Sequence, residues 1–212
     1  MGELTACTGI LDDRAMRLSA STLAPCLIVL PAAAQTPPAP SAPAEQPAPA
    51  DRKPSSIDDL FDRLAKAQDE AEAKGIASLI ERRWSRSGSD TADLLLSRAA
   101  QATAQKEYPL AIELLDRVLV LEPGWVSAWY QRATVFYLLD DPVSAMADIR
   151  QVITREPRHF GAWVGLGHIF MTSDDKSRAL QAFRRALKIY PQLPSVQPMV
   201  DRLASEVEGK DL

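Results

Sequence analysis

Residues of the same kind recur every 34 positions through the second half of this 212-residue chain. The spacing is shared by three prolines and three alanines: Pro123, Pro157 and Pro191, and Ala111, Ala145 and Ala179. No gap is needed to keep the register. Self-similarity at a fixed period of about 20 to 50 residues is typical of repeat arrays, in which one supersecondary unit stacks on the next. The period therefore predicts a helical repeat array of three units.

The columns between these markers differ in size. Small residues hold one column (Ala99, Ala133 and Gly167), and bulky apolar residues hold others, such as Leu95, Trp129 and Trp163, or Leu115, Ile149 and Phe183. Small residues let two helices approach closely, and bulky residues fill the space between one unit and the next. A single helical hairpin cannot bury its own apolar face, so the core of such an array forms by stacking. We expect each proline to end a unit, because proline cannot continue a helix.

The third copy carries a motif that can be compared with known repeats. It contains, in order, Trp163-x-x-Leu166-Gly167-x-x-Phe170, Ala179-x-x-x-Phe183 and Pro191. This pattern resembles the tetratricopeptide repeat (TPR), whose signature is W-x-x-L-G-x-x-Y, A-x-x-x-F and P. The resemblance implies an all-α fold, an α-solenoid of helix-turn-helix repeats, with units over residues 92–125, 126–159 and 160–193. Arg98 and Arg132 stand where the family usually has leucine; we expect partial exposure or an ion pair, because an unpaired buried charge is costly.

A further helical hairpin is predicted before the array. Residues 56–91 follow the period only in part, and we interpret them as a degenerate N-terminal hairpin with a break at Gly75. Glu81, Trp84 and Ser89 do not fit the columns of the other copies. Terminal units of a solenoid are often atypical, because one of their faces meets water. The hairpin is therefore expected to be an irregular terminal copy of the array.

Two other segments flank the repeats. Residues 194–212 carry apolar side chains at fourfold spacing and are predicted to form a C-terminal capping helix and tail. Residues 35–55 are rich in proline and alanine and contain no large apolar residue, so they cannot build a core. We interpret them as a disordered linker that holds the array away from whatever binds the N-terminus.

The first 34 residues have features of an export signal. Leu23–Ala34 is an apolar run that is too short to span a bilayer and ends in an A-x-A cleavage pattern. Acidic residues precede the run, so translation is interpreted as starting at Met16 instead of Met1. We predict that residues 1–34 are a signal peptide, that the protein is periplasmic, and that the mature chain has no transmembrane segment. Two alternatives stay open: a lipoprotein site at Cys26, and a cytoplasmic protein with a disordered tail.

Composition argues against most catalytic and nucleic-acid functions. Both cysteines, Cys7 and Cys26, fall in the predicted signal peptide, so a mature chain would have no disulfide or thiol chemistry. The net charge of −4 gives nucleic acid little reason to bind. His159 and His168 have neither metal-ligand spacing nor a neighbouring nucleophile, and we interpret His159 as a junction residue packed near Phe160. The sequence therefore predicts no enzyme activity, no metal and no cofactor.

The resemblance also implies a binding surface. In a TPR stack the first helix of each unit lines a concave groove, and the residues that would face it here are Leu96, Ala100, Tyr130, Thr134, Tyr137, Val164, His168 and Met171. Some TPR proteins hold a C-terminal carboxylate with Lys, Asn and Arg at such positions, which this chain lacks. The sequence favours a protein-protein interaction adaptor that binds an apolar segment of a protein or peptide partner. The alternative is a structural assembly or self-association module that uses the convex or terminal faces.

Overall fold

The computed structural model describes residues 56–209. The predicted signal peptide over 1–34, with both cysteines and Met16, lies outside the described residues, and so do the predicted linker over 35–55 and the last three residues of the chain. Every regular element between residues 56 and 209 is an α-helix, which confirms the predicted all-α fold. Among these helices, none combines the length and the apolar character needed to cross a bilayer.

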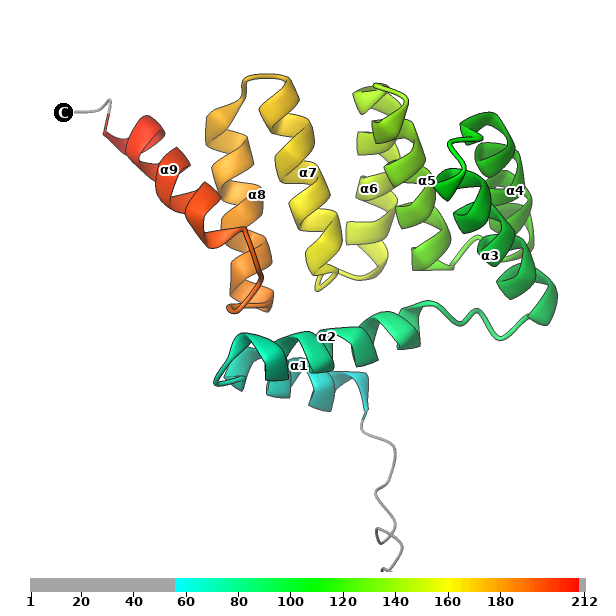
Figure 1. Ribbon diagram of the computed structural model, residues 1–212, viewed down its shortest axis with the longest axis horizontal. Coiled ribbons are helices and arrows are strands. Elements are labelled where there is room, and N and C mark those ends of the chain that lie inside the picture. Colours follow the sequence, from blue (N-terminus) through cyan, green and yellow to red (C-terminus); the bar gives the residue numbers. More distant parts are fainter. Residues whose placement is uncertain (1–55, 210–212) are drawn as a thin grey trace, which may run out of the picture. The chain divides into compact units, whose positions relative to one another are not determined.

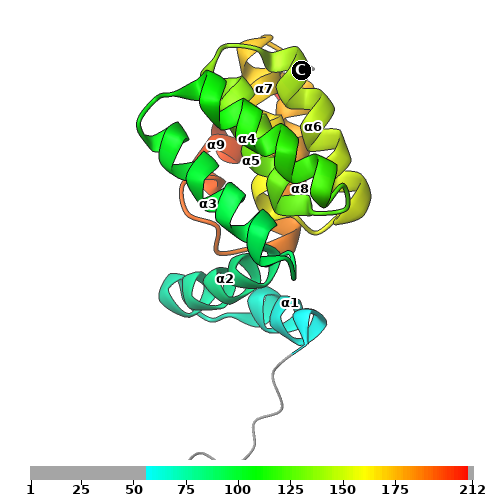
Figure 2. The same ribbon diagram turned by 90° about the vertical axis from the view of Figure 1, so that its right-hand side faces the viewer.

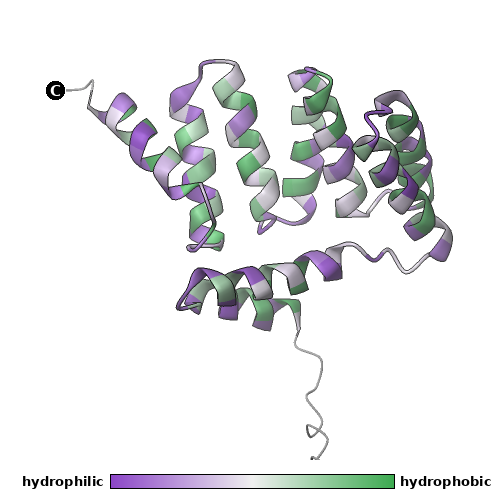
Figure 3. Ribbon diagram, viewed as in Figure 1, coloured by the Kyte–Doolittle hydropathy of each residue, from purple (hydrophilic) through white to green (hydrophobic). Residues whose placement is uncertain are grey.

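Nine helices follow one another along the described residues (Figure 1). They are α1 (Ile57–Lys66), α2 (Glu70–Trp84), α3 (Asp90–Ala104), α4 (Tyr108–Leu121), α5 (Val126–Leu138), α6 (Pro142–Arg155), α7 (Phe160–Thr172), α8 (Lys176–Ile189) and α9 (Gln197–Glu208). The starts of α4, α6 and α8 are 34 residues apart, as the period predicts. Hydrophobic and hydrophilic residues are interspersed along each helix, as expected for amphipathic helices that share one core (Figure 3).

The pairs α3–α4, α5–α6 and α7–α8 stack one after another as a solenoid. Small residues lie between the two helices of each pair: Ala111, Ala145 and Ala179 are fully buried. The closest approach is at Gly167, where a β-carbon would lie 2.5 Å from Cε1 of Phe183. Real β-carbons do not approach a ring carbon so closely, so a larger residue at this position would require the Phe183 ring or the helices to shift. The columns of small residues therefore lie at the helix crossings, as expected.

The two arginines in the leucine column also behave as expected. Nε and Nη2 of Arg132 donate to the two carboxylate oxygens of Asp148 over 2.7 and 2.8 Å, and Nη1 donates to Asp116 over 2.6 Å. The guanidinium carbon lies 4.9 Å from the centre of the Trp129 ring. Arg98, at the end of the array, is exposed. A buried carboxylate and an aromatic face therefore compensate the charge of Arg132 inside the stack.

The N-terminal hairpin differs from the expected terminal copy. It does not stack on α3 and α4; Figures 1 and 2 show α1 and α2 lying across one edge of the array. The inner side of the hairpin packs against the junction between α6 and α7 and against the end of α8, in a cluster of Leu60, Phe61, Leu64, Ile76 and Ile80 with Phe160, Tyr190 and Leu193. These apolar contacts stabilise the hairpin at the edge of the array instead of at its end. The hairpin therefore contacts both ends of the third unit along one side.

The break in this hairpin is also displaced from its expected position. Gly75 lies inside α2, and the chain turns earlier, between α1 and α2. The side chain of Asp69 accepts a hydrogen bond from the backbone N–H of Glu72 over 2.8 Å and so caps the start of α2. Glycine inside a helix costs only about 1 kcal/mol, and the buried side chains of Ile76 and Ile80 on the same helix outweigh that cost.

At the other end, α9 covers α8. Val200 and Leu203 are buried against Leu180 and Phe183 of α8. An ion pair of 2.8 Å between Nζ of Lys176 and Oε2 of Glu206 joins the same two helices near their ends. The last repeat thus buries its outer face beneath a single amphipathic helix.

Candidate functional site

A cavity of about 320 Å³ opens between α5, α7 and the segment that follows α8. Its lining is mainly apolar and aromatic: Tyr130, Ala133, Thr134, Tyr137, Ile149, Phe160, Gly161, Val164, Gly165, His168, Ile169 and Leu193. Most of these residues come from α5 and α7, the first helices of the second and third pairs. A hollow with few polar atoms suits apolar side chains or an apolar ligand.

Five of the eight residues that the sequence assigns to the groove line this cavity: Tyr130, Thr134, Tyr137, Val164 and His168. The other three do not. Leu96 belongs to the core between α3 and α5, where it is 5% exposed, so its assignment to an open groove surface is wrong. Ala100 is exposed but lies outside the cavity, and Met171 packs against the cluster of α8 and α9. The hollow therefore involves the second and third pairs only.

The two tyrosines have different roles in the wall of the cavity. The Tyr130 ring lies 4.6 Å from the imidazole of His159, and its hydroxyl is so close to Gly161 that a β-carbon there would be 2.9 Å away. Burial raises the pKa of Tyr130, and the charge of Glu81 raises it further. Tyr130 is therefore a fixed part of the wall. Tyr137 is 39% exposed at the surface and is available to a ligand.

A second hollow of about 230 Å³ adjoins the first, and both are lined by Tyr130, Phe160 and Gly161. The other residues around it are Glu81, Trp84, Ser127, Gln131 and His159. Helix α2 thus supplies one wall, which sequence reasoning missed. The available signal was the irregularity of the hairpin, because Glu81 and Trp84 are two of the positions that broke the period. We call the two adjoining hollows the groove.

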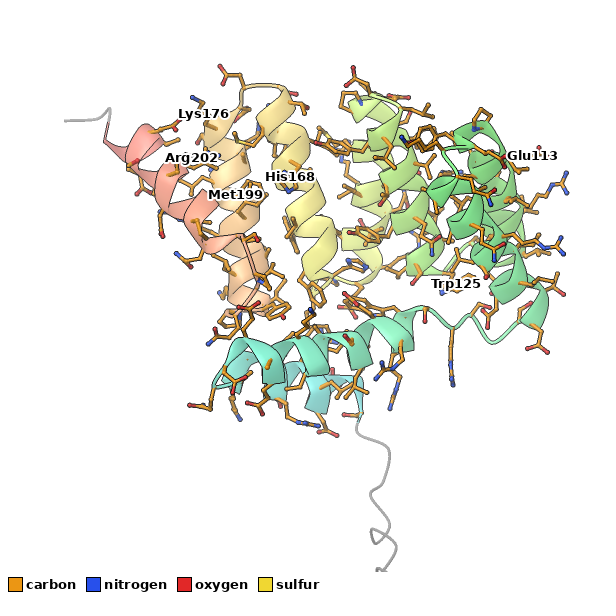
Figure 4. All side chains as sticks on the ribbon, viewed as in Figure 1. Glu113, Trp125, His168, Lys176, Met199 and Arg202 are labelled. Carbon is orange, nitrogen blue, oxygen red and sulfur yellow. The ribbon has the colours of Figure 1, made fainter. Side chains whose placement is uncertain are left out.

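The end of α2 is fixed to the array by hydrogen bonds and by stacking. Nε1 of Trp125 and Oγ of Ser127 both donate to the backbone carbonyl of Trp84 over 2.7 Å. The Trp84 indole stacks on His159, and Figure 4 labels Trp125 at the start of α5, beside the end of α2. His159 packs near Phe160, with ring centroids 6.3 Å apart, so the predicted packing of this junction residue is confirmed. The wall that α2 forms is held in place at its far end.

Burial favours the neutral form of both histidines of the groove. Burial lowers the pKa of His159 to about 4, and its Nδ1 accepts a hydrogen bond of 3.0 Å from the backbone N–H of Ala162. His168, labelled on α7 in Figure 4, has its pKa lowered by burial and packs edge-on against Phe183. Within residues 56–209, no group of three or more His, Cys, Asp or Glu side chains is placed to hold a metal ion. The groove offers shape, apolar surface and a few polar atoms.

Comparison with known proteins is consistent with this architecture. A family profile described as tetratricopeptide repeat matches residues 130–194. A TPR repeat-containing protein from Rhizobium etli is 34% identical over 153 residues, which cover 72% of this chain and 75% of that protein. The likeness therefore extends over most of both chains.

Two solved structures share the fold at low sequence identity. The first TPR of Spaghetti (RPAP3), bound to the HSP90 peptide SRMEEVD, gives a TM-score of 0.54 at 16% identity and covers 57% of this chain and 95% of its own. The type III secretion chaperone SycD of Yersinia enterocolitica, in complex with a peptide of the translocator YopD, gives 0.50 at 14% identity and covers 58% and 94%. Likeness at this level concerns the arrangement of the helices alone.

Proposed function

The chain belongs to the tetratricopeptide-repeat family, and on this premise we propose that it is a non-catalytic adaptor that holds a segment of a partner protein in its groove. Proteins of this family are generally interaction modules without catalysis. The observation that carries the proposal is the apolar hollow of about 320 Å³ between α5 and α7, at whose rim Tyr137 is exposed. A rigid aromatic side chain beside an apolar hollow is typical of the anchor points of protein interfaces.

The structural neighbours support a peptide as the occupant. SycD and the first TPR of RPAP3 were both solved with a bound peptide. The peptide of the latter ends in acidic residues, for which the groove described here offers no lysine or arginine. We therefore propose an apolar segment, in extended or helical form, with its side chains inserted between α5 and α7.

Site-specific photo-crosslinking from Tyr137 in cells tests this proposal. Tyr137 is a better position than Tyr130, which is packed into the wall and whose loss would disturb the fold. The matched control is a crosslinker at Val143, which is 77% exposed on α6 and lines no part of the groove. We expect a partner to be trapped from position 137 and not from 143, and the Tyr137→Ala variant to bind the purified partner about tenfold more weakly. Equal trapping at both positions would contradict the proposal.

One observation favours self-association as a second candidate. Because α1 and α2 lie along the edge of the array, the outer surface of α3 and α4 keeps exposed apolar side chains: Leu94, Leu110, Val120 and Leu121. Val120 is 82% exposed. Sedimentation of the wild type and of the Val120→Glu variant distinguishes the two functions. Self-association would be supported by two results together: the wild type sediments as an oligomer that the Val120→Glu substitution dissociates, and the Tyr137→Ala variant still binds its partner.

We also propose that the protein is exported to the periplasm. The support is the apolar run that ends in Ala32–Ala34 and the small residues suited to cleavage there. Sequencing the N-terminus of the protein isolated from cells tests this directly. Gln35 as the first residue is the expected result. An intact Met1 or Met16 would instead favour a cytoplasmic protein.

A further inference from the structure

We propose that the segment captured in the groove carries a cationic side chain beside its apolar anchors, and that Glu81 receives this charge. The inference rests on the proposed adaptor function and adds the chemistry of the partner. Glu81 is the one acidic side chain among the residues that line the two hollows of the groove. It comes from α2, outside the repeat units, so it is specific to the way this chain places its hairpin.

Three side chains with rings lie near Glu81. It shares the second hollow with Tyr130 and His159. Burial raises the pKa of the Tyr130 and Tyr190 hydroxyls, and the charge of Glu81 raises both further. Burial raises the pKa of Glu81 itself. Glu81 is nevertheless exposed to solvent at the edge of this hollow, so a ligand can reach its carboxylate.

Within residues 56–209, no basic side chain pairs with this carboxylate. Among the described residues, Glu81 has no ion pair and no side-chain hydrogen bond, and neither hollow is lined by lysine or arginine. Arg158, next to His159, already donates to Asp58 and Glu156 over 2.7 and 3.2 Å. The arginines at the end of α2 line a different hollow, with Leu60 and Leu79: Arg82, Arg83 and Arg86. A carboxylate without such a partner, beside an apolar hollow, attracts a positive charge from the ligand.

The geometry also predicts how far apart the cation and the apolar anchor lie in the bound segment. Glu81 lies by the Tyr130 end of the groove, and Tyr137 lies two helical turns further along α5, about 10 Å away at 1.5 Å per residue. An extended chain covers about 10 Å in three residues. An extended ligand should therefore carry its lysine or arginine about three residues from the apolar side chain that meets Tyr137. The cation and the apolar anchor occupy opposite ends of the segment.

Selection of random peptides displayed on phage, against the full chain, tests the inference. We expect the wild type to enrich peptides with a basic residue about three positions from an aliphatic or aromatic one. The Glu81→Gln variant should lose the basic preference, and Glu81→Lys should select acidic residues instead. Replacing the lysine of a selected peptide by methionine should weaken its binding to the wild type about tenfold, and should have little effect with Glu81→Gln. Glu113→Gln, an exposed residue of α4 that pairs with Arg117, is the matched control and should select like the wild type.

The outcomes separate this inference from the function on which it rests. If the selected peptides need Tyr137 for binding but are not enriched in lysine or arginine, the role of Glu81 is overturned and the groove remains a binding site. A selection that yields no peptide, or only peptides that bind the Tyr137→Ala variant equally well, would overturn capture in the groove itself. Binding to the wild type that weakens with added salt, while binding to Glu81→Gln does not, is the third expected result.

Discussion

The indole of Trp84 stacks face to face on the imidazole of His159, with ring centroids 4.3 Å apart and an angle of 10° between the ring planes. Trp84 is the last residue of α2, and His159 caps the start of α7. The same imidazole lies against Tyr130 of the groove wall. A single buried, neutral histidine thus joins the hairpin, the repeat junction and the candidate binding site.

This stack makes stability depend on pH. The pKa of His159 is about 4 in the folded protein and 6.5 in its ordinary state, so the unfolded chain takes up the proton first as the pH falls. The contribution is complete above pH 6.5 and is lost progressively between pH 6.5 and 4. We expect the free energy of unfolding, measured with urea, to fall by about 1.4 kcal/mol between pH 7.5 and 5.5.

Two variants isolate the titration of His159. His168→Gln serves as the background, because burial also lowers the pKa of His168 and would add to the same trend. On this background, His159→Asn keeps a side-chain acceptor at the start of α7 and should flatten the dependence between pH 7.5 and 5.5. An NMR titration that places the pKa of His159 near 6.5 would contradict the expectation.

Removing one partner of the Arg132–Asp148 ion pair should destabilise the protein more than replacing both partners by apolar residues. Asp148 is 4% exposed, so the Arg132→Leu variant leaves a buried carboxylate without its partner. We expect it to lower the free energy of unfolding by about 3 kcal/mol. The third repeat has Leu166 and Ala182 in the same columns, and the double variant Arg132→Leu/Asp148→Ala copies that pair. Urea unfolding should show the double variant to be more stable than the single one; equal stabilities would refute this reading.

Replacing Gly167 by alanine should test the closest helix crossing. The added β-carbon would meet the Phe183 ring at 2.5 to 2.7 Å, and overpacking of this kind costs about 1 to 3 kcal/mol. Gly124→Ala is the control, because a β-carbon there has no neighbour within 4 Å. The first repeat combines Ala99 with Leu115, so Gly167→Ala/Phe183→Leu should recover part of the loss in thermal unfolding. A single Gly167→Ala variant as stable as the control would show that the ring can move aside.

The repeat units could be predicted from the sequence because their stabilising contacts are local and periodic. Each alanine or glycine at a crossing has its counterpart 34 residues away, so the helix pairs followed from column positions. The ion pair of Arg132 was one of the two outcomes expected for an arginine in the leucine column. The hairpin obeys no such rule. Its contacts join residues far apart in sequence, such as Phe61 with Arg158, whose guanidinium lies 4.2 Å from the ring centre. A pattern in one segment does not indicate which distant surface it will cover.

The misfits of the hairpin turn out to be informative. Glu81 lines the groove, Trp84 stacks on His159, and the side chain of Ser89 accepts a hydrogen bond from the backbone N–H of Ala92 at the start of α3. Each therefore has a task that a regular repeat residue in the same column does not have. The groove was predicted over all three units, whereas the hollows are lined mainly by the second and third pairs and by α2, whose position the repeat pattern does not indicate.

The hairpin along the edge of the array has a thermodynamic consequence for any partner. By joining the starts of α5 and α7 to the end of α8, it limits how far neighbouring repeats can rotate against one another. A short solenoid without such a brace would lose that freedom when it closes on a ligand, and the lost entropy would weaken binding. Here the hairpin already orders the repeats in the folded chain, so a segment bound in the proposed groove would meet a preorganised surface.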